Sequence, residues 1–350
     1  MNHPDSIAEA ALSARVFPGA ALYLSKADRL LHHAAYGRLG YEAPFLEPVS
    51  LETQYDLASL TKIYVLALAL KLSRELDRPL TSPVSLILPG FDPRLTPAHL
   101  LGHASGITVS LQSLAEAPVE HWVSRLAAAP LGWAPGERVL YSCGNTFLAA
   151  RLLEAWTGES LDSLLEIHLF RPLGLTDTTS TPRPDRVAPT EANGAGYRRG
   201  QVHDEAARAW AARTGTVCGN AGLFATAADV ARFARIWLAA WPGRSGTAPG
   251  HETAGAILTA GDLARVAQSP LPEQSFLRGL GWQIGARFYI GERAPAHTWG
   301  HLGFTGPSLV VNPATSHLAV ILNNRVHPSR EGPNRMPYHA AWHDWLFTQT

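Results

Sequence analysis

The chain has 350 residues, 46% of them hydrophobic, so it is long and apolar enough to bury a large core and to form two parts that share a cleft. Lysine plus arginine and aspartate plus glutamate both number 29. With a sequence pI of about 7.3, this balance predicts no basic surface for nucleic acid or an anionic membrane. The two cysteines, Cys143 and Cys218, are too few for a disulfide framework and lack C-x-x-C metal spacing.

The two ends of the chain have the pattern of a sheet with covering helices. A helix is expected over residues 5–15, followed by a hairpin of strands 20–25 and 30–36. Near the other end, Gly, Pro and Asn residues separate four short strand-like runs, and a closing helix follows. We expect these strands over residues 279–286, 297–300, 307–312 and 318–323, and the helix over residues 336–347.

The middle of the chain has the pattern of helices with clear start signals. Thr96 followed by Pro97 is typical of a helix N-terminus, and Thr226 with Asp229 resembles a capping box. A further helix is expected over residues 145–156. Two stretches rich in proline and glycine are expected to be surface loops, residues 181–200 and 241–250.

These patterns predict an α+β fold. If the two ends pair in one antiparallel sheet flanked by helices, the middle is an inserted, mostly helical subdomain, and a groove lies where the two parts meet. We expect a single unit over residues 1–350. Its sheet part would comprise residues 1–58 and 275–350, and its helical part residues 59–274.

The stretch Ser59-Leu60-Thr61-Lys62 places a hydroxyl and an amine at helical spacing. On a helix both lie on one face, so the Lys62 ammonium can reach the Ser59 hydroxyl. Serine is a weak nucleophile until a neighbouring base takes its proton, and lysine can be that base. The apolar run 63–70 follows at once, which predicts Ser59 in the first turn of a buried helix, among free N–H groups suited to an oxyanion.

This spacing alone is also typical of a helix turn with a surface lysine, but two further motifs follow it. They are Tyr141-Ser142-Cys143 and His301-Leu302-Gly303, the second continuing into Phe304-Thr305-Gly306. With these motifs in this order, the chain resembles the serine β-lactamase and penicillin-binding protein superfamily. The resemblance is greatest to the class C-like branch, which includes family VIII carboxylesterases and D-amino-acid peptidases, and it extends over nearly the whole sequence.

The resemblance implies a mechanism of acyl transfer to water. Ser59 would attack a carbonyl, and Lys62 would share the role of base and acid with Tyr141, because an ammonium favours the anionic form of a nearby phenol. The N–H groups of Ser59 and Phe304 would hold the oxyanion. Gly303 would permit close approach of the substrate to the strand. No metal or organic cofactor is expected.

Cys143 departs from the family's pattern, which usually has Asn or Asp at this position. A thiol is a poor hydrogen-bond partner for Lys62 or for a peptide-like substrate, so antibiotic-type amides are less expected as substrates. Asn145 is equally interpreted as a substitute for that amide or as a helix cap. A nucleophilic Cys143 is disfavoured because no surrounding motif gives it a base of its own.

His301 also departs from many relatives, which carry a lysine there. Imidazole is mostly neutral at pH 7 and attracts a substrate carboxylate less than lysine does. Esters without a carboxylate therefore become more plausible substrates. The alternative interpretation of His301 is an edge-strand histidine without a role in binding.

Other polar residues are interpreted as structural. Ser105 lacks the G-x-S-x-G pattern of an α/β-hydrolase, and the stretch His203-Asp204-Glu205 is expected in a loop near the cleft. His339 and His343 are four residues apart on the last helix, a spacing that can bind a metal. We expect these two histidines to face solvent.

The sequence therefore predicts a serine hydrolase that forms an acyl-enzyme on Ser59 and acts on small esters or D-amino-acid-type amides. One alternative is a penicillin-binding protein or a weak β-lactamase acting on a lactam. A different class, a non-catalytic ligand sensor that retains the pocket, stays open because Cys143 interrupts one motif. The first residues show no basic segment followed by an apolar stretch, and the apolar run 63–70 is shorter than the roughly 18 residues that span a bilayer. A cytoplasmic protein without a membrane span is expected.

Overall fold

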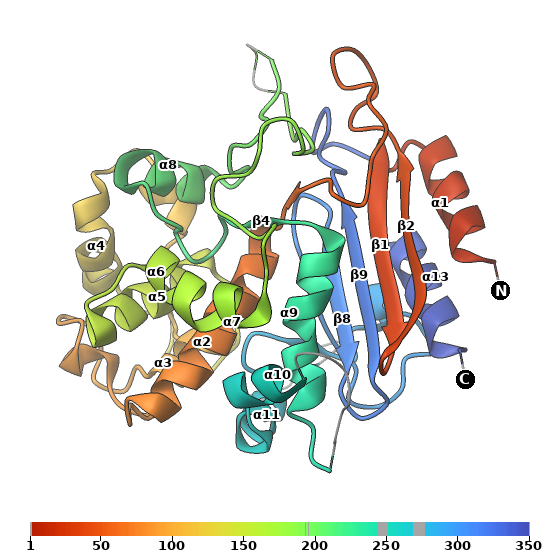
Figure 1. Ribbon diagram of the computed structural model, residues 1–350. Helices are drawn as coiled ribbons and strands as arrows, with labels where there is room; N and C mark the ends of the chain where they lie inside the picture. Colours follow the sequence, from red (N-terminus) through yellow and green to blue (C-terminus); the bar gives the residue numbers. More distant parts are fainter. Residues whose placement is uncertain (1, 193, 195, 244–250, 269–276, 350) are drawn as a thin grey trace.

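Figure 1 shows the computed structural model, which describes residues 2–192, 194, 196–243, 251–268 and 277–349. Within these residues seven strands form one antiparallel sheet, in the order β2-β1-β9-β8-β7-β6-β5. The strands are β1 (Gly19–Lys26), β2 (Arg29–Gly37), β5 (Leu277–Arg278), β6 (Gln283–Ile284), β7 (Trp299–Leu302), β8 (Ser308–Asn312) and β9 (His317–Asn323). Because β1 pairs with β9, the two ends of the chain meet inside one sheet.

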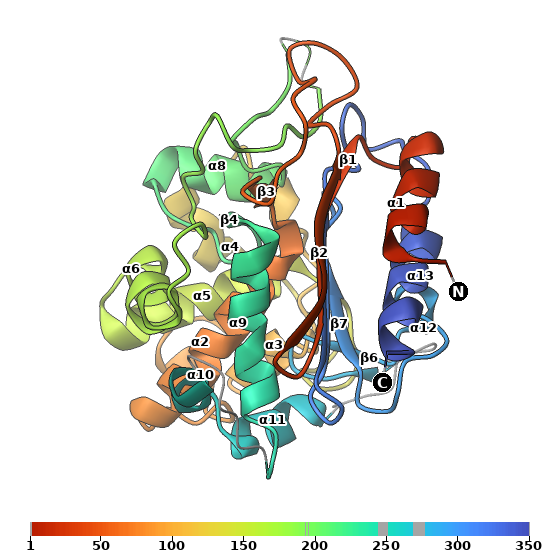
Figure 2. The same cartoon turned by 45° about the vertical axis from the view of Figure 1, so that its right-hand side comes forward.

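Helices cover both faces of the sheet (Figures 1 and 2). One face carries α1 (Pro4–Ser13), α12 (Arg287–Ile290) and α13 (Met336–Phe347). The other face carries α9 (Ala227–Ala239), and beyond it lies α2 (Thr61–Glu75). The remaining helices are α3 (Pro97–Leu101), α4 (Trp122–Ala128), α5 (Cys143–Thr157), α6 (Leu161–Leu165), α7 (Arg171–Leu173), α8 (Glu205–Thr214), α10 (His251–Ile257) and α11 (Ala260–Ala267).

The central strands are buried on both sides because successive residues of a strand face opposite sides of the sheet. On β9, Val320 and Leu322 belong to the large core that includes α2 and α9. Ile321, between them, packs instead with Trp342 in the smaller core under α1 and α13. The Trp342 indole also donates a hydrogen bond to the carbonyl of Pro4 at 3.0 Å, which fixes α13 against the start of α1.

Most predicted elements occur within two residues of the expected bounds, but the strand expected over 279–286 does not form. The chain makes a β5–β6 hairpin there and continues into α12. Gly281 has a φ of +71°, which favours glycine, and a Cβ on Gly279 would lie 1.9 Å from the carbonyl oxygen of Val266. The two glycines therefore let the chain turn against α11 where an extended strand was expected.

The structure describes most of the first expected loop but only the start of the second. Residues 181–200 contain no helix or strand in the portion that the structure describes, and residues 244–250 of the second loop lie outside the described residues. Near the groove, β3 (Tyr55–Asp56) and β4 (Phe224–Ala225) pair in a two-stranded sheet. Across the described ranges, no helix has the length and apolar character needed to cross a membrane.

Candidate active site

Ser59 lies in a 3₁₀ turn, Ala58–Leu60, that leads directly into α2. Asp56, at the end of β3, holds this turn, because its Oδ1 accepts the Ala58 N–H at 2.8 Å. Ala58 has a φ of +45°, a left-handed conformation that is uncommon outside glycine. The local hydrogen bond to Asp56 therefore supports a strained bend immediately before Ser59.

Lys62 is buried on the first turn of α2 and points its amine at three acceptors. Its Nζ donates to Ser59 Oγ at 2.9 Å and to the Asn220 carbonyl oxygen at 2.7 Å, and lies 3.7 Å from Cys143 Sγ. Burial by itself opposes the charge, but the nearby Cys143 and Tyr141 groups outweigh it and raise the pKa of Lys62 above its ordinary value. The raised pKa favours the charged amine, which donates its hydrogen bond to Ser59 Oγ.

Tyr141 lies beside Lys62 in the loop that precedes α5. The centroid of its ring is 5.2 Å from Lys62 Nζ, and 40% of the residue is exposed. His103 holds the loop on both sides: its carbonyl accepts the Leu140 N–H at 2.8 Å and its Nδ1 accepts the Ser142 N–H at 3.3 Å. The loop is therefore fixed by its backbone while the phenol stays accessible.

Tyr141→Phe should retain the ring contacts and remove only the hydroxyl. If the phenol moves the proton, kcat for a short-chain nitrophenyl ester should fall by about 10²- to 10⁴-fold, with a much smaller change in KM. Steady-state kinetics would measure both constants. An unchanged kcat would remove Tyr141 from proton transfer.

His301 lies on β7, which pairs with β6 at Trp299 and Gly300, whereas His301 itself pairs with Leu309 of β8. The residue is 3% exposed, and its Nδ1 lies 3.1 Å from the Leu302 carbonyl oxygen. Burial, with the charges of Lys62 and Arg278, holds the pKa of His301 well below its usual range. The lowered pKa favours the neutral imidazole at pH 7.

The turn after β7 packs directly against the turn of Ser59. A Cβ on Gly303 would lie 2.6 Å from the carbonyl oxygen of Leu57, so the close approach that this glycine permits is to the protein's own backbone. Thr305 Oγ1 donates to the Asp56 carbonyl at 2.7 Å and ties the two turns together. Between these contacts, the Phe304 N–H makes no hydrogen bond to the described part of the chain.

Cys143 and Asn145 both lie in the first turn of α5, but only Cys143 reaches Lys62. The Asn145 amide is buried elsewhere: its Oδ1 accepts a hydrogen bond from Ser105 Oγ at 2.6 Å. The N-cap of α5 is Ser142, whose hydroxyl accepts the Gly144 N–H at 3.2 Å. The helix-cap interpretation of Asn145 is therefore wrong, and its amide contacts Ser105.

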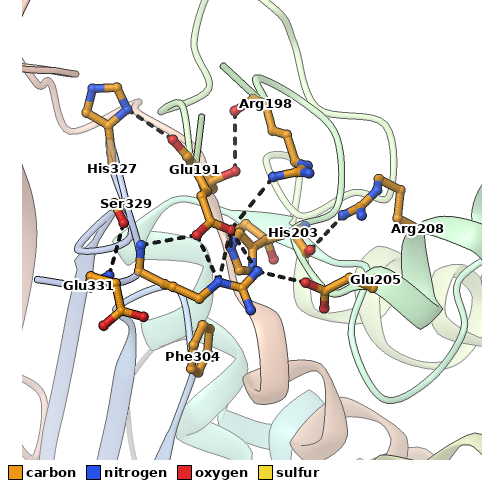
Figure 3. Close-up of polar contacts among 12 residues, drawn as sticks. Glu191, Arg198, His203, Glu205, Arg208, Phe304, His327, Ser329 and Glu331 are labelled. Carbon is orange, nitrogen blue, oxygen red and sulfur yellow. Dashed lines mark hydrogen bonds and ion pairs between the residues drawn. The ribbon is translucent and has the colours of Figure 1, made fainter. Parts of the chain in front are cut away.

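A cluster of ion pairs lies on one side of the Phe304 ring (Figure 3). Arg330 Nη2 lies 2.7 Å from Glu191 Oε2 and 2.7 Å from Glu205 Oε1. His203 Nε2 lies 3.1 Å from the same Glu191 oxygen, and the His203 ring stacks on Phe304 with 5.7 Å between centroids. The stretch 203–205 thus lies beside the turn of Phe304.

The ion pair between Arg330 and Glu191 predicts a pH-dependent contribution to stability. Hydrogen bonding to Arg330 lowers the pKa of Glu191 from 4.5 to about 2. A carboxylate with a lowered folded pKa stabilises the protein above its unfolded pKa and loses that effect as the pH falls through the folded pKa. Glu191→Gln should therefore reduce the free energy of unfolding in urea more at about pH 6 than at about pH 3. An equal reduction at both pH values would contradict this role.

Four residues of the site were not assigned a role from the sequence: Asp56, His103, Asn220 and Arg278. Asp56 has a recognisable signal, since aspartate often accepts the N–H two residues on in a turn. Asn220 contacts Lys62 through its backbone carbonyl. Because every residue has this group, the residue type gives no signal in the sequence. Arg278 is 4% exposed, and its guanidinium carbon lies 5.3 Å from the centroid of the Tyr141 ring.

The two histidines of α13 are not solvent-facing, contrary to expectation. His339 and His343 are both 0% exposed, and His343 Nδ1 lies 2.8 Å from the Tyr289 carbonyl oxygen. The helix is covered by the sheet on one side and by α1 and α12 on others, so these two histidines are enclosed. In the described ranges no group of three or more His, Cys, Asp or Glu residues could hold a metal ion.

A serine in hydrogen-bond contact with a buried lysine, beside a tyrosine and a turn with a free N–H, defines a serine hydrolase of the S-x-x-K type. The model of the family described as Beta-lactamase matches residues 5–341. The chain therefore belongs to the beta-lactamase family.

Relatives agree with this assignment. The chain is 28% identical over 367 residues to a putative D-alanyl-D-alanine carboxypeptidase of Escherichia coli K12, covering 92% of this chain and 81% of the relative. EstCE1, a hydrolase with promiscuous acyltransferase activity, has a similar structure with a TM-score of 0.76 at 20% identity, covering 98% and 97% of the two chains. A beta-lactamase/D-alanine carboxypeptidase from Pseudomonas syringae has a TM-score of 0.77 at 14% identity, covering 99% and 98%. At these identities the structural likeness shows the shared fold.

Proposed function

We propose that the protein hydrolyses small esters or D-amino-acid-type amides through an acyl-enzyme on Ser59. The observation that carries this proposal is the 2.9 Å contact from Lys62 Nζ to Ser59 Oγ. In the proposed sequence Ser59 attacks the carbonyl, the N–H groups of Ser59 and Phe304 hold the oxyanion, and water then cleaves the acyl-enzyme. The substrate is a small molecule bound in the groove.

The contacts of Lys62 support a division of roles in proton transfer. An ammonium that donates to Ser59 Oγ cannot accept the Ser59 proton at the same time, and the raised pKa of Lys62 favours this charged form. We therefore assign the final acceptor of the Ser59 proton to Tyr141, with Lys62 as the relay: the ammonium gives one proton to the ionised phenol as it takes one from Ser59. The proton then passes to the leaving group.

Some features of the chain favour D-amino-acid amides as substrates, and another favours esters. The buried Arg278 beside Tyr141 provides positive charge for a carboxylate, and the relatives named putative D-alanyl-D-alanine carboxypeptidases support D-amino-acid amides. Cys143 replaces a hydrogen-bonding amide with a thiol, which supports esters that need fewer polar contacts. We rank these two substrate classes together and place lactams second.

We also propose that the chain acts as one catalytic unit. Ser59, Lys62 and Tyr141 come from the helical part, residues 59–274, and the turn of Phe304 comes from the sheet part, residues 1–58 and 275–350. Both parts would then be needed to complete the site. A cytoplasmic location stays a prediction from the sequence.

Parallel assays would separate the substrate classes. The protein would be incubated with a short-chain nitrophenyl ester, a D-alanine nitroanilide, a chromogenic cephalosporin and a fluorescent penicillin, with Ser59→Ala as the control. Turnover of the ester or anilide by the wild type alone supports the proposal. A stable penicillin adduct without turnover of any substrate would identify a penicillin-binding protein, and rapid cephalosporin turnover would identify a β-lactamase.

A further inference from the structure

Three side chains hold the turn that contains the Phe304 N–H by donating hydrogen bonds to its carbonyl groups. Arg335 Nη2 donates to the Gly303 carbonyl at 2.9 Å, and Arg325 Nε donates to the Phe304 carbonyl at 3.0 Å. Asn323 Nδ2 donates to the Gly306 carbonyl at 3.2 Å. The three donors come from the end of β9 and from the segment leading into α13, which lie in the sheet part. The turn is therefore oriented by side chains from segments that follow it in the chain.

The contact with Arg335 has a direct geometric consequence. The Gly303 carbonyl and the Phe304 N–H belong to the same planar peptide group, in which a trans bond points the oxygen and the hydrogen in opposite directions. A donor bound to the Gly303 oxygen therefore fixes the direction in which the Phe304 N–H points. The Gly306 N–H, 3.2 Å from the same oxygen, occupies its second lone pair and limits rotation further.

Burying the Arg335 cation costs free energy, and an ion pair does not explain why the residue is buried. The residue is 6% exposed, and within the described residues it has no carboxylate partner and its Nε has no hydrogen-bond acceptor. Burial, with the neighbouring charge of Arg325, lowers the pKa of Arg335 to about 9. A buried cation without a counter-ion destabilises the fold unless hydrogen bonds compensate for its lost hydration. The bond to Gly303 is the polar contact that the structure gives it.

A charged donor also changes the strength of the N–H at the other end of the peptide group. Hydrogen bonds from an ionised group are roughly twice as strong as neutral ones, and they polarise the group that accepts them. Polarisation of the Gly303 carbonyl makes the Phe304 N–H more positive. The same contact therefore orients the N–H and strengthens it as a donor to a developing oxyanion.

We propose that Arg335 is a positioning residue for the oxyanion hole, acting through the Gly303–Phe304 peptide group. This inference rests on the proposed function, because it assigns a supporting residue to the N–H that would bind the oxyanion. Arg335 does not touch the substrate in this account. Its loss should weaken transition-state binding while leaving substrate binding nearly unchanged.

The test compares Arg335→Met and Arg335→Lys with the wild type. Methionine fills much of the buried volume but has no donor. We therefore expect kcat for a nitrophenyl ester to fall by about 10- to 100-fold, with KM within about twofold of the wild type. This loss is smaller than the roughly 10²- to 10³-fold loss that follows removal of an oxyanion donor itself. Lysine keeps a charged donor and should recover part of the loss. Arg287→Met is a matched control, since Arg287 Nη1 donates to the Glu292 and Ala294 carbonyls at 2.8 Å in a different loop.

A second readout reports on stabilisation of a tetrahedral adduct without a turnover step. A short alkyl boronic acid forms a tetrahedral adduct with an active serine, so its affinity should fall across the Arg335 variants in proportion to kcat/KM. A general loss of folded protein would lower the active fraction without changing the affinity of the remaining molecules. This readout therefore stays informative for Arg335→Lys even if Arg335→Met does not fold.

The outcomes separate this inference from the proposed function. A wild type that neither turns over the ester nor binds the boronic acid would overturn the proposed function. An active wild type whose kcat and boronate affinity match those of both Arg335 variants would overturn the role of Arg335 alone. A rise in KM with unchanged kcat and boronate affinity would do the same, because it would assign Arg335 to substrate binding.

Discussion

Ser59→Ala is expected to abolish hydrolysis, with kcat/KM for a nitrophenyl ester falling on the order of 10⁶-fold. The substitution removes the atom that we propose forms the acyl bond, and neither Lys62 nor Tyr141 replaces it as the nucleophile. The fold should be retained, because Lys62 keeps its 2.7 Å hydrogen bond to the Asn220 carbonyl. Steady-state kinetics and thermal unfolding of the same preparation would measure both effects.

A matched substitution controls for the loss of a serine hydroxyl elsewhere. Ser124 lies on α4, where its Oγ donates to the His121 carbonyl at 3.0 Å, and Ser124→Ala should leave kcat/KM unchanged. Full activity in Ser59→Ala would assign the nucleophile to another residue. A loss of activity accompanied by unfolding would instead show that the turn of Ser59 is structural.

Lys62→Met should produce the second largest loss, with the acylation rate falling by about 10³-fold or more. Methionine matches the length and the burial of the lysine stem but neither donates to Ser59 nor carries charge. The Asn220 carbonyl loses its donor, which should lower the free energy of unfolding by about 1–3 kcal/mol. Stopped-flow measurement of the nitrophenol burst would give the acylation rate, and urea unfolding would give the stability.

Lys62→Arg distinguishes charge from proton transfer at this position. A guanidinium keeps the cation beside Tyr141 but does not give up a proton in proteins. If Lys62 is a proton relay, Arg should be nearly as inactive as Met. Recovery to within about tenfold of the wild-type rate would show that charge alone is needed, and would remove Lys62 from the path of the proton.

Local patterns were sufficient for the elements whose contacts lie close in sequence. The spacing of Ser59 and Lys62 is a property of one helix turn, so it predicted a contact that the structure places at 2.9 Å. The helix predicted over residues 336–347 has these bounds in the structure. The roles of Tyr141 and Phe304 depended on family resemblance and stay predictions, although the structure brings Tyr141 beside Lys62.

Contacts between distant segments account for what the sequence did not predict. The amide of Asn145 is satisfied by Ser105, which lies 40 residues earlier, so its local position on α5 gave no indication of its partner. The hairpin that replaced the strand 279–286 depends on the approach of Gly279 to Val266. Arg335 acts on a turn 32 residues away in the chain. Side chains that orient a loop by binding its carbonyls have no sequence motif, because any donor that can reach the carbonyl can make the hydrogen bond.

Mass spectrometry of the intact protein after brief exposure to an activated ester or a penicillin tests the central claim most directly. The account predicts one covalent adduct with the mass of the acyl group, located by digestion to the peptide that contains Ser59 and absent from Ser59→Ala. An adduct located on Cys143 or on any other residue, and retained in Ser59→Ala, would contradict it.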